Sequence, residues 1–343
     1  MCRYCMIVPS DVLLRLARDE DVENHTREAF RTTAQLDHQM RLLRDQTQHF
    51  TMQAVSLLGL PLINTKPPAI TVYDCNNGTS LPGAAVSKPA SSTDVTIKTI
   101  FETTTKVAEF FKEVFGRNSL DGAGMALQSS AHYGLNYNNA FWNGTQMAYG
   151  DGDGEIFTGF YRGDDVIAHE LTHGVTQYTL QLEYQNESGG LNESMSDVFG
   201  SMFKQWRRNQ TVVDADWLIG ADIMGSLAKE KGYTCLRDMA APDAAHCLAP
   251  QITSFRQYVN RMDPHNSSGV PNLAFYLAAK AVGGKSWEKT GQIWYDVFAN
   301  HGSDPTMTMS AFANAIRDSA GALYPGDVSV HDAVDEAWRE VGL

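Results

Sequence analysis

The sequence feature that most constrains the fold is a pair of histidines four residues apart, His169 and His173, with Glu170 directly after the first. Residues four apart lie on one face of an α-helix, so a helix here would direct both imidazoles at a single metal ion. This HExxH spacing is typical of a helix that binds zinc and places a glutamate beside it as a general base. The pattern also occurs by chance on polar helices, so the rest of the chain must supply a third ligand.

A second acidic segment, NESMSD at residues 192–197, follows the histidines. Glu193 and Asp197 are again four apart, so a helix over 191–204 would bring Glu193 to the metal and place Asp197 one turn further along the same face. From there Asp197 can hold a ligand histidine by its other ring nitrogen. A plain solvated aspartate is the alternative. Two histidines and one carboxylate leave a position open on a tetrahedral zinc ion, which is typical of a catalytic site.

The composition is that of an ordinary soluble globular protein. A chain of 343 residues that is 43% hydrophobic and 20% charged is long enough for two lobes around a buried cleft. Its net charge of −13 argues against nucleic acid or an anionic membrane surface as partners. No apolar run is long enough to cross a bilayer, and the N-terminus lacks the apolar centre of a secretory signal. We therefore expect a cytoplasmic protein, or one exported by a route that the sequence does not show.

The five cysteines, an odd number, do not form a disulfide framework. Cys2 and Cys5 form a CxxC without a second pair, so a zinc knuckle is not expected. One of their thiolates could instead occupy the open metal position, or the segment could be a solvent-exposed leader. Cys235 and Cys247 could pair across a loop in an oxidising compartment, and Cys75 is interpreted as a small residue beside a turn. None of the five is expected to carry the chemistry.

The hydrophobic pattern alternates between helical and strand-like segments. Residues 11–48 indicate one or two charged amphipathic helices, which are interpreted as a prosegment rather than a core domain. Strands are expected over 55–73 and 124–149, with a helix over 94–115 between them. A helix that begins at Asp164 carries the two histidines and bridges two lobes. The rest is mostly helical, with helices expected over 271–282, 285–299, 308–321 and 331–341.

Several longer motifs carry a resemblance to a known family. The HExxH and NExxSD motifs occur together with YNNAFWNG (137–144), GDGDG (150–154), YQNESG (184–189) and PHNSSG (264–269). With these motifs in the family's order, the chain resembles the thermolysin family of zinc endopeptidases from about Ile70 to its C-terminus.

The front of the chain resembles the short propeptide of the protealysin-like subgroup of that family. The similarity lies in IVPS at 7–10, which leads into VLLRLA at 12–17. The subgroup prefers two consecutive prolines where this chain has Pro9 followed by Ser10.

The resemblance implies an α+β fold. This is a two-lobed thermolysin-like zincin, with a β-rich N-terminal lobe and a mainly α-helical C-terminal lobe joined by a central zinc-binding helix. It divides the chain into a propeptide at 1–50, an N-terminal lobe at 51–178 and a C-terminal lobe at 179–343. The propeptide would inhibit the enzyme intramolecularly until it is removed near 49–54. The family is secreted, and the mature enzyme would be a monomer that acts on peptides or proteins.

The resemblance also implies how a substrate is held. Asn139 and the backbone of Ala140 would bind an extended peptide as an added strand, and Arg237 would bind a substrate carbonyl oxygen. Without the resemblance, Asn139 would be a turn residue and Arg237 a solvated surface arginine. The pocket for the side chain after the scissile bond would be apolar and lined by residues that periodicity alone assigns to the core, namely Phe157, Phe160, Val166 and Leu236. Phe160 would narrow this pocket where relatives have a smaller residue.

Two further residues would stabilise negative charge on the substrate carbonyl oxygen. By this resemblance His265 and Tyr184 donate hydrogen bonds to it, each worth about 3 kcal/mol. His265 is singled out through its motif, since a lone histidine is more often structural than catalytic. The best-known relatives place the aspartate that orients this histidine farther upstream, so Asp263, two residues before His265, is the candidate for that role here.

Relatives with a paired calcium site have acids at five positions, which correspond to Asp165, Lys204, Asp216, Leu218 and Ala221. Three of the five are not acidic in this chain. Calcium needs six to eight oxygen ligands, so the paired site is expected to be absent. Lys204 would supply the missing positive charge by pairing with Asp165 or Asp216. Calcium at other positions stays open.

Together these residues predict a zinc metalloendopeptidase that cleaves on the N-terminal side of bulky hydrophobic residues and is made as an autoprocessed zymogen. His169, His173 and Glu193 would hold the zinc, and Glu170 would take a proton from the attacking water and pass it to the leaving amine. Two alternatives belong to other classes. A zinc-bearing binding module would have no need of Glu170, and a hydrolase of small non-peptide amides would have no use for Asn139.

Overall fold

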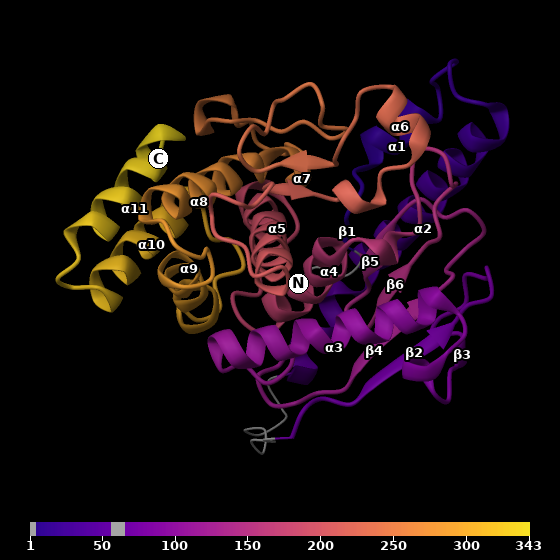
Figure 1. The fold of residues 1–343 in the computed structure, drawn as a ribbon, viewed down its shortest axis with the longest axis horizontal. Helices are drawn as coiled ribbons and strands as arrows, with labels where there is room; N and C mark the ends of the chain where they lie inside the picture. Colours follow the sequence, from indigo (N-terminus) through magenta and orange to yellow (C-terminus); the bar gives the residue numbers. More distant parts are fainter. Residues whose placement is uncertain (1–4, 56–65) are drawn as a thin grey trace.

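The computed structural model describes residues 5–55 and 66–343. These residues form a β-rich lobe, a helical lobe and, between the two, a pair of buried helices, α4 (Asp164–Gln177) and α5 (Asn186–Arg207). In Figure 1 the helical lobe, orange to yellow, lies at one end of the long axis and the sheet at the other. The two-lobed α+β architecture predicted from the sequence is therefore confirmed.

The β-rich lobe is built on a six-stranded mixed sheet in the order β1-β5-β6-β4-β2-β3. β4 pairs in parallel with both β2 and β6, whereas β1, β3 and β5 run antiparallel to their neighbours. Because β1 comes from the front of the chain, this front segment covers the sheet edge at β5. The strands are β1 (Cys5–Met6), β2 (Ile70–Asp74), β3 (Ala84–Ala85), β4 (Leu127–Ala131), β5 (Ala140–Trp142) and β6 (Met147–Tyr149).

The helix α3 (Val95–Phe115) packs against β2 and β4 with its apolar face. Asp94 caps its N-terminus, because its side chain accepts hydrogen bonds from the backbone amides of Thr96 and Ile97 at 2.8 and 3.2 Å. Gly116 ends the helix with φ at 71°, a left-handed conformation that favours glycine. Local sequence thus determines both ends of this helix.

The central helices α4 and α5 pack against each other and are buried along most of their length. A glycine permits this close approach, because a Cβ on Gly200 of α5 would lie 2.8 Å from the backbone oxygen of Asp165 in α4. A second glycine, Gly174 of α4, lies against Leu120, whose side chain would be 2.5 Å from an added Cβ. Helices buried on all sides are typical of the core of a large protein. The polar residues on their contacting faces therefore lie at the centre of the molecule.

The C-terminal lobe is mainly helical, as predicted. Trp294 and Trp338 stack with ring centroids 6.1 Å apart and join two of its helices. A two-stranded sheet of β7 (Leu218–Ile219) and β8 (Arg237–Asp238) lies in its first part. The helices of this lobe are α6 (Ser226–Glu230), α7 (Pro264–Ser267), α8 (Gly269–Val282), α9 (Lys289–Asn300), α10 (Met309–Leu323) and α11 (Val328–Glu340), with short 3-10 helices at η3 (Ala221–Ile223) and η4 (Phe255–Gln257). Two further 3-10 helices, η1 (Pro89–Ser91) and η2 (Phe160–Arg162), belong to the β-rich lobe.

The front of the chain forms two helices, α1 (Ser10–Leu16) and α2 (Asn24–Val55), which confirms the helices expected there. The strand expected over 55–73 is found in β2 from Ile70 onward, but Val55 still belongs to α2 and residues 66–69 are in no strand. A helix that has already nucleated extends at little cost per residue, whereas a strand needs a partner. Residues 56–65 of that expectation lie outside the described residues. The expected propeptide boundary at 50/51 falls inside α2 and stays a prediction.

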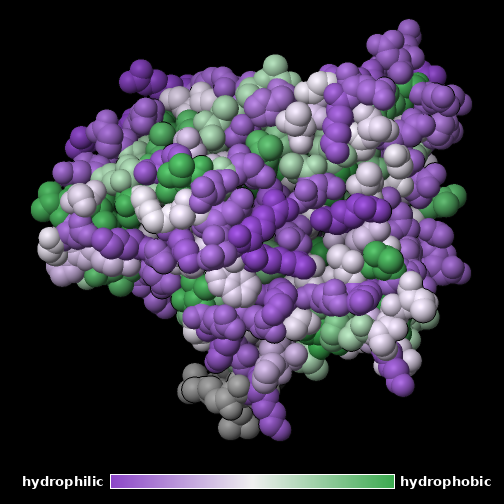
Figure 2. Space-filling model, in the orientation of Figure 1, coloured by the Kyte–Doolittle hydropathy of each residue, from purple (hydrophilic) through white to green (hydrophobic). Residues whose placement is uncertain are grey.

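The surface is mixed in character. Figure 2 shows one face, on which hydrophilic residues are interspersed with apolar ones. Within 5–55 and 66–343, no helix combines the length and the apolar character needed to span a membrane.

Candidate metal and peptide-binding site

Three buried side chains from α4 and α5 converge at the centre of the molecule. The Nε2 atoms of His169 and His173 are 3.0 Å apart, and each lies 3.4 Å from a carboxylate oxygen of Glu193. One ligand atom from each of the three lies within 4.8 Å of the others. The structure thus brings together the three residues that helical spacing predicts as metal ligands.

Acceptors hold the other ring nitrogen of each histidine. His169 Nδ1 lies 2.9 Å from Asp197 Oδ1, and His173 Nδ1 lies 2.9 Å from Asn192 Oδ1. When both Nδ1 atoms donate their protons there, the two Nε2 atoms direct lone pairs at each other across 3.0 Å, which calls for a cation between them. Two imidazoles and one carboxylate fit Zn²⁺ and leave one coordination position for a further ligand.

The pKa values of the two histidines also indicate that this site favours a positive charge. Burial, together with the charge on His169, lowers the pKa of His173 to about 3, although the Glu193 carboxylate acts to raise it. Burial also acts to lower the pKa of His169, but the carboxylates of Asp197 and Glu193 raise it to about 9. The pair therefore binds one proton, which a metal ion would replace.

Glu170 follows His169 on α4 and is fully buried. Neither of its carboxylate oxygens has a hydrogen-bond partner of ordinary geometry among the described residues. Burial raises the pKa of Glu170 to about 8, and a cation held by the neighbouring ligands would oppose this effect. A buried carboxylate that makes no ordinary hydrogen bond to the described residues is suited to exchanging a proton with a bound molecule.

His265 from α7 and Tyr184 lie beside the metal ligands. The Tyr184 hydroxyl is 3.3 Å from His265 Nε2 and donates a short hydrogen bond to Glu193. Asp263 Oδ1 accepts from His265 Nδ1 at 2.8 Å and from the His265 backbone amide at 2.9 Å, so the nearby aspartate does reach the ring. Burial acts to lower the pKa of His265, but the carboxylates of Glu193 and Asp263 raise it.

Arg237 is fully buried and lies behind the metal ligands rather than on the surface. Its Nε and Nη2 donate to the two carboxylate oxygens of Asp197 at 2.8 and 2.7 Å, and Asn272 donates to Asp197 at 2.9 Å. Burial acts to raise the pKa of Asp197, but Arg237 and His169 lower it to about 2. The third donor of Arg237, Nη1, binds the backbone oxygen of Ile7 at 2.9 Å.

The residues around β1 lie along β5 as an added antiparallel strand. The backbone amide of Val8 donates to the Asn139 side chain at 2.9 Å, and that side chain donates back to the Val8 carbonyl at 3.1 Å. The backbone amide of Ile7 donates to the Ala140 carbonyl at 3.2 Å. The structure therefore shows Asn139 and Ala140 binding an extended segment, which is the chain's own front end.

The carbonyl oxygens of this segment meet polar side chains in turn. That of Met6 lies 2.5 Å from His265 Nε2, and that of Ile7 accepts from Arg237. The peptide unit between Met6 and Ile7 therefore lies within reach of the residues that surround the metal ligands.

The four residues predicted to line an apolar pocket are all buried in the main core cluster: Phe157, Phe160, Val166 and Leu236. The rings of Phe157 and Phe160 lie 5.3 Å apart, and Phe157 also meets Phe30 of α2 at 6.1 Å. Ile7 is buried in the same cluster. Their role as walls of a substrate pocket stays a prediction.

Some residues that contact the site were not found from the sequence. Ser196 Oγ lies 3.0 Å from His173 Nδ1, beside Asn192. Asn192 and Ser196 are four apart in the NESMSD segment, so the same helical spacing could have identified them. Asp37 of α2 accepts a hydrogen bond from the Asn139 side chain at 2.8 Å, although the two residues are 102 positions apart in the sequence. The local sequence pattern does not predict this contact.

The cysteines differ from what was expected. Cys5 is disulfide-bonded, so its sulfur is not a thiolate available to the metal. Cys2 lies outside the described residues. Cys75, Cys235 and Cys247 are buried and free, so the disulfide considered between Cys235 and Cys247 is not formed.

Lys204 lies among the positions that form a paired calcium site in some relatives. Its Nζ is 3.5 Å from Asp165 Oδ2, 3.0 Å from Asp216 Oδ1 and 3.0 Å from the backbone oxygen of Leu218. The ammonium group thus pairs with both aspartates that the sequence suggested as alternatives.

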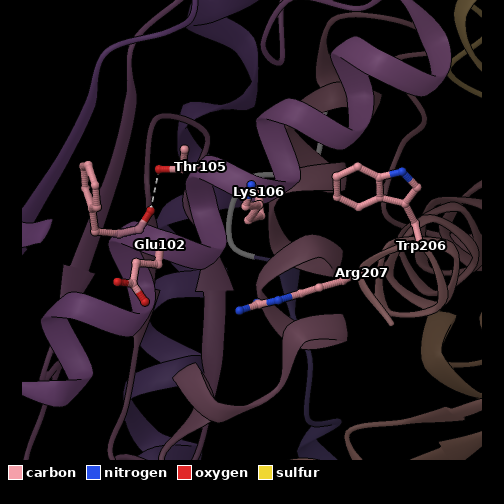
Figure 3. A pocket seen from close by; sticks show the side chains of 6 residues that line it. Glu102, Thr105, Lys106, Trp206 and Arg207 are labelled. Carbon is pink, nitrogen blue, oxygen red and sulfur yellow. Dashed lines mark hydrogen bonds between the residues drawn. The ribbon is translucent and has the colours of Figure 1, made fainter. Parts of the chain in front are cut away.

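A separate hollow of about 590 Å³ lies between α3 and α5, away from the metal ligands. Figure 3 shows the side chains that line it, with Glu102, Thr105 and Lys106 from α3 and Trp206 and Arg207 from α5. It contains none of the predicted site residues. A smaller hollow of about 410 Å³ lies beside the front segment and has Asp263 and His265 in its lining. Met6, Ile7 and Val8 themselves are buried.

Comparisons with known proteins agree with this geometry. The family model for the thermolysin metallopeptidase catalytic domain matches residues 33–177, and that for the thermolysin metallopeptidase alpha-helical domain matches residues 180–343. The chain is 37% identical to an extracellular metalloprotease of Pectobacterium carotovorum subsp. carotovorum, over 99% of this chain and 96% of that protein. It is 38% identical to protease PrtS of Photorhabdus sp. (strain Az29), over 80% of this chain and 76% of that protein.

A solved structure is similar over nearly the full length. It is the precursor of protealysin, a metalloproteinase from Serratia proteamaculans, with a TM-score of 0.83 and 35% identity over 98% of this chain and 99% of that one. Fold and site together define a metallopeptidase, a hydrolase of peptide bonds. The chain belongs to the thermolysin family. This family implies zinc, and the group formed by His169, His173 and Glu193 is able to bind it.

Proposed function

We propose that the protein is a zinc-dependent endopeptidase made as a precursor, whose own front segment occupies the substrate groove. The observation that carries this proposal is the register of residues 6–8 along β5. Their backbone groups meet His265, Arg237, Asn139 and Ala140 in succession. A groove that satisfies consecutive peptide units suits an extended peptide, and neither a small-amide hydrolase nor a zinc-bearing scaffold would need it.

A substrate would bind as this segment does, antiparallel to β5. His169, His173 and Glu193 would hold the zinc, which supplies Lewis-acid activation of the water and of the substrate carbonyl. Glu170 takes a proton from the attacking water and delivers it to the leaving amine. Its oxygens make no hydrogen bond of ordinary geometry to the described part of the chain, which supports this role because they remain available to the reactants.

Negative charge then develops on the scissile carbonyl oxygen, where His265 and Tyr184 donate hydrogen bonds worth about 3 kcal/mol each. The contact of 2.5 Å between His265 Nε2 and the Met6 carbonyl oxygen supports this assignment. Asp263 accepts from Nδ1 of the same ring and so directs the other nitrogen toward the substrate.

We also propose that cleavage occurs on the N-terminal side of a bulky hydrophobic residue. Ile7 follows the peptide unit that contacts His265, and its side chain is buried in the cluster that contains Phe157, Phe160 and Leu236. Val166 belongs to the same cluster. An apolar pocket gains about 0.8 kcal/mol for each methylene that it removes from water, so larger apolar side chains would be preferred.

The precursor state and the location follow from the relatives. One relative is described as an extracellular metalloprotease, and the similar solved structure is a precursor. We infer that this chain is likewise secreted and acts as a monomer on peptides or proteins, with the prosegment as its inhibitor. Removal of the prosegment near 49–54 requires the end of α2 to unwind, because the groove accepts extended chain.

The intact mass of the chain during incubation with zinc tests this function. The wild type is expected to lose a fragment of roughly fifty residues, whereas Glu170→Ala stays whole because it lacks the general base. Glu170 is not a metal ligand in this assignment, so the variant should bind as much zinc as the wild type at the catalytic ligands.

Two results would contradict the proposal. One is processing of Glu170→Ala at the wild-type rate, which would show that the base is elsewhere or that another protease cuts the chain. The other is a wild type that binds zinc and, after the prosegment is cut by an added protease, still hydrolyses no peptide. That result would favour a binding module.

A further inference from the structure

A second group of metal-ligating side chains lies outside the peptidase site, in the segment around β8. Cys235, His246 and Cys247 each offer a ligand atom, and these atoms lie within 4.8 Å of one another. Cys235 and Cys247 are buried, whereas the His246 side chain is 36% exposed. The proposed peptidase chemistry uses none of the three.

The separation of the two sulfur atoms, 3.9 Å, is informative. A disulfide requires about 2.05 Å, so the two cysteines are thiols, unlike Cys5 in the same structure. Two thiolates bound to one tetrahedral zinc ion, with bonds of about 2.3 Å, lie about 3.8 Å apart. The sulfur pair therefore already has the spacing of two zinc ligands.

Backbone pairing holds this arrangement in place. Cys235 and Cys247 lie opposite each other in an isolated parallel bridge. On either side of it, Leu248 donates its backbone amide to the Cys235 carbonyl at 2.9 Å, and Thr234 donates to the His246 carbonyl at 3.0 Å. The ligands are thus positioned by backbone hydrogen bonds and do not depend on a bound ion for their approach.

Asp238 is a hydrogen-bonding carboxylate partner of His246, of the kind that a metal-bound histidine usually has. Its Oδ2 lies 3.0 Å from His246 Nε2, while its Oδ1 accepts from the backbone amides of Ala240 and Ala241 at 2.8 and 3.2 Å. A carboxylate fixed on one ring nitrogen orients the imidazole and leaves the other nitrogen free for a metal.

We propose that Cys235, Cys247 and His246 bind a second Zn²⁺ ion, with water as the fourth ligand on the exposed side of His246. Two thiolates and one imidazole favour a soft cation over calcium or magnesium. Leu236 and Arg237 directly follow Cys235, so this ion fixes the strand that carries two of the predicted substrate-binding residues.

The test uses the full-length Glu170→Ala chain, equilibrated with zinc and freed of loosely bound metal. Elemental mass spectrometry is expected to find two zinc ions per chain in this parent and one in each of Cys247→Ser and His246→Ala. Cys75→Ser is the matched control, because it removes a buried free thiol elsewhere and should leave two ions.

Cobalt(II) in place of zinc gives a second measurement that distinguishes the two sites. The catalytic ligands include no sulfur, so a thiolate-to-cobalt charge-transfer band is expected only from the second site. It should be lost in Cys247→Ser and retained in Cys75→Ser.

Three results would overturn the proposal: one zinc ion per parent chain, a charge-transfer band that survives in Cys247→Ser, or peptide mapping that finds Cys235 disulfide-bonded to Cys247. The number of zinc ions bound by the parent chain tests the proposal even when a variant does not fold. None of these measurements depends on peptidase activity, so they fail or succeed separately from the proposed function.

Discussion

At the scale of single residues, Arg237 contacts both the proposed metal site and the extended segment bound along β5. Two of its donors bind Asp197, which holds His169, and a third binds the carbonyl of Ile7. A planar guanidinium with donors on several edges can make these contacts together, whereas a lysine cannot. Arg237 therefore links the position of a bound peptide to the orientation of a proposed metal ligand.

The residue His132 leads to a prediction about pH. It adopts φ of 52°, and its ring nitrogens lie 2.7 Å from Asp151 and 3.1 Å from Asp94. The Asp151 and Asp94 carboxylates raise its pKa from 6.5 to about 9, against the effect of burial. Because the folded pKa is higher, the protonated histidine stabilises the fold fully below about pH 6.5, and this contribution is lost as the pH rises through about 9.

We therefore expect His132→Gln to lower the free energy of unfolding by about 1–2 kcal/mol at about pH 6, with a smaller difference above about pH 9. Denaturant titrations of both chains in a Glu170→Ala background measure this difference without self-digestion. A wild-type minus variant difference that stays constant across this range would show that the charge on His132 does not matter.

At the scale of elements, the two central helices are the most predictable part of the fold. HExxH and NExxSD each place two functional residues one turn apart, so chemistry and helical spacing give the same answer for α4 and α5. Asp164 begins α4 as predicted, and α5 extends beyond the predicted 191–204 at both ends. Helix ends are less predictable, because they depend on caps and on packing with distant residues.

Short strands could not be predicted with the same success. β1 has only two residues, and it exists because its backbone pairs with β5, more than a hundred residues later in the chain. Asn139 and Ala140 were predicted as a peptide-binding edge through the family resemblance, but nothing in the local pattern of 5–8 indicates the register in which this edge is filled. Contacts between distant segments decide that register.

An element-scale prediction concerns Lys204 on α5. Asp165 is fully buried, and the ammonium of Lys204 is its cationic partner at 3.5 Å. Removing one partner of a buried ion pair costs about 3–5 kcal/mol, so Lys204→Met is expected to lower the melting temperature by about 5–15 °C. We propose that this lysine replaces calcium, so chelating calcium from the wild type with zinc held constant should leave the melting temperature unchanged.

Lys106→Met is the matched control for this prediction. Lys106 is an exposed lysine that pairs with Glu109 on α3, so its replacement should change stability by less than about 1 kcal/mol. A large drop in the wild-type melting temperature on calcium chelation would contradict the replacement of calcium by Lys204.

At the scale of the whole molecule, the prosegment contacts both lobes. On the N-terminal lobe, Thr33 accepts from the backbone amide of Asn138 at 3.0 Å. On the C-terminal lobe, Asp19 pairs with Lys231 at 3.1 Å. The segment therefore lies along β5 and also contacts both lobes, which supports the proposal that it acts as an intramolecular inhibitor.

Asp37 is the buried anchor of this arrangement. Tyr137 donates to one of its oxygens at 2.5 Å, and the Asn139 side chain donates to the other at 2.8 Å. Asp37→Ala leaves both donors without this partner, which costs about 2–3 kcal/mol and corresponds to a docking equilibrium weaker by about 30–150-fold. We expect a full-length Glu170→Ala, Asp37→Ala chain to bind a fluorescent apolar peptide more tightly than Glu170→Ala alone, by up to that factor.

The matched control is Glu28→Ala on the same helix, because Glu28 is exposed and pairs only with Arg31 among the contacts described. It should leave peptide binding unchanged. If peptide affinity were the same with and without Asp37, the groove would be opened by a local release of residues 5–8 alone, and the long helix α2 would not contribute to inhibition. A gain in peptide affinity restricted to the Asp37→Ala variant would instead show that Asp37, which is not among the metal ligands, controls access to the metal site. Asp37 would do so because it binds Asn139, the side chain that also binds the peptide.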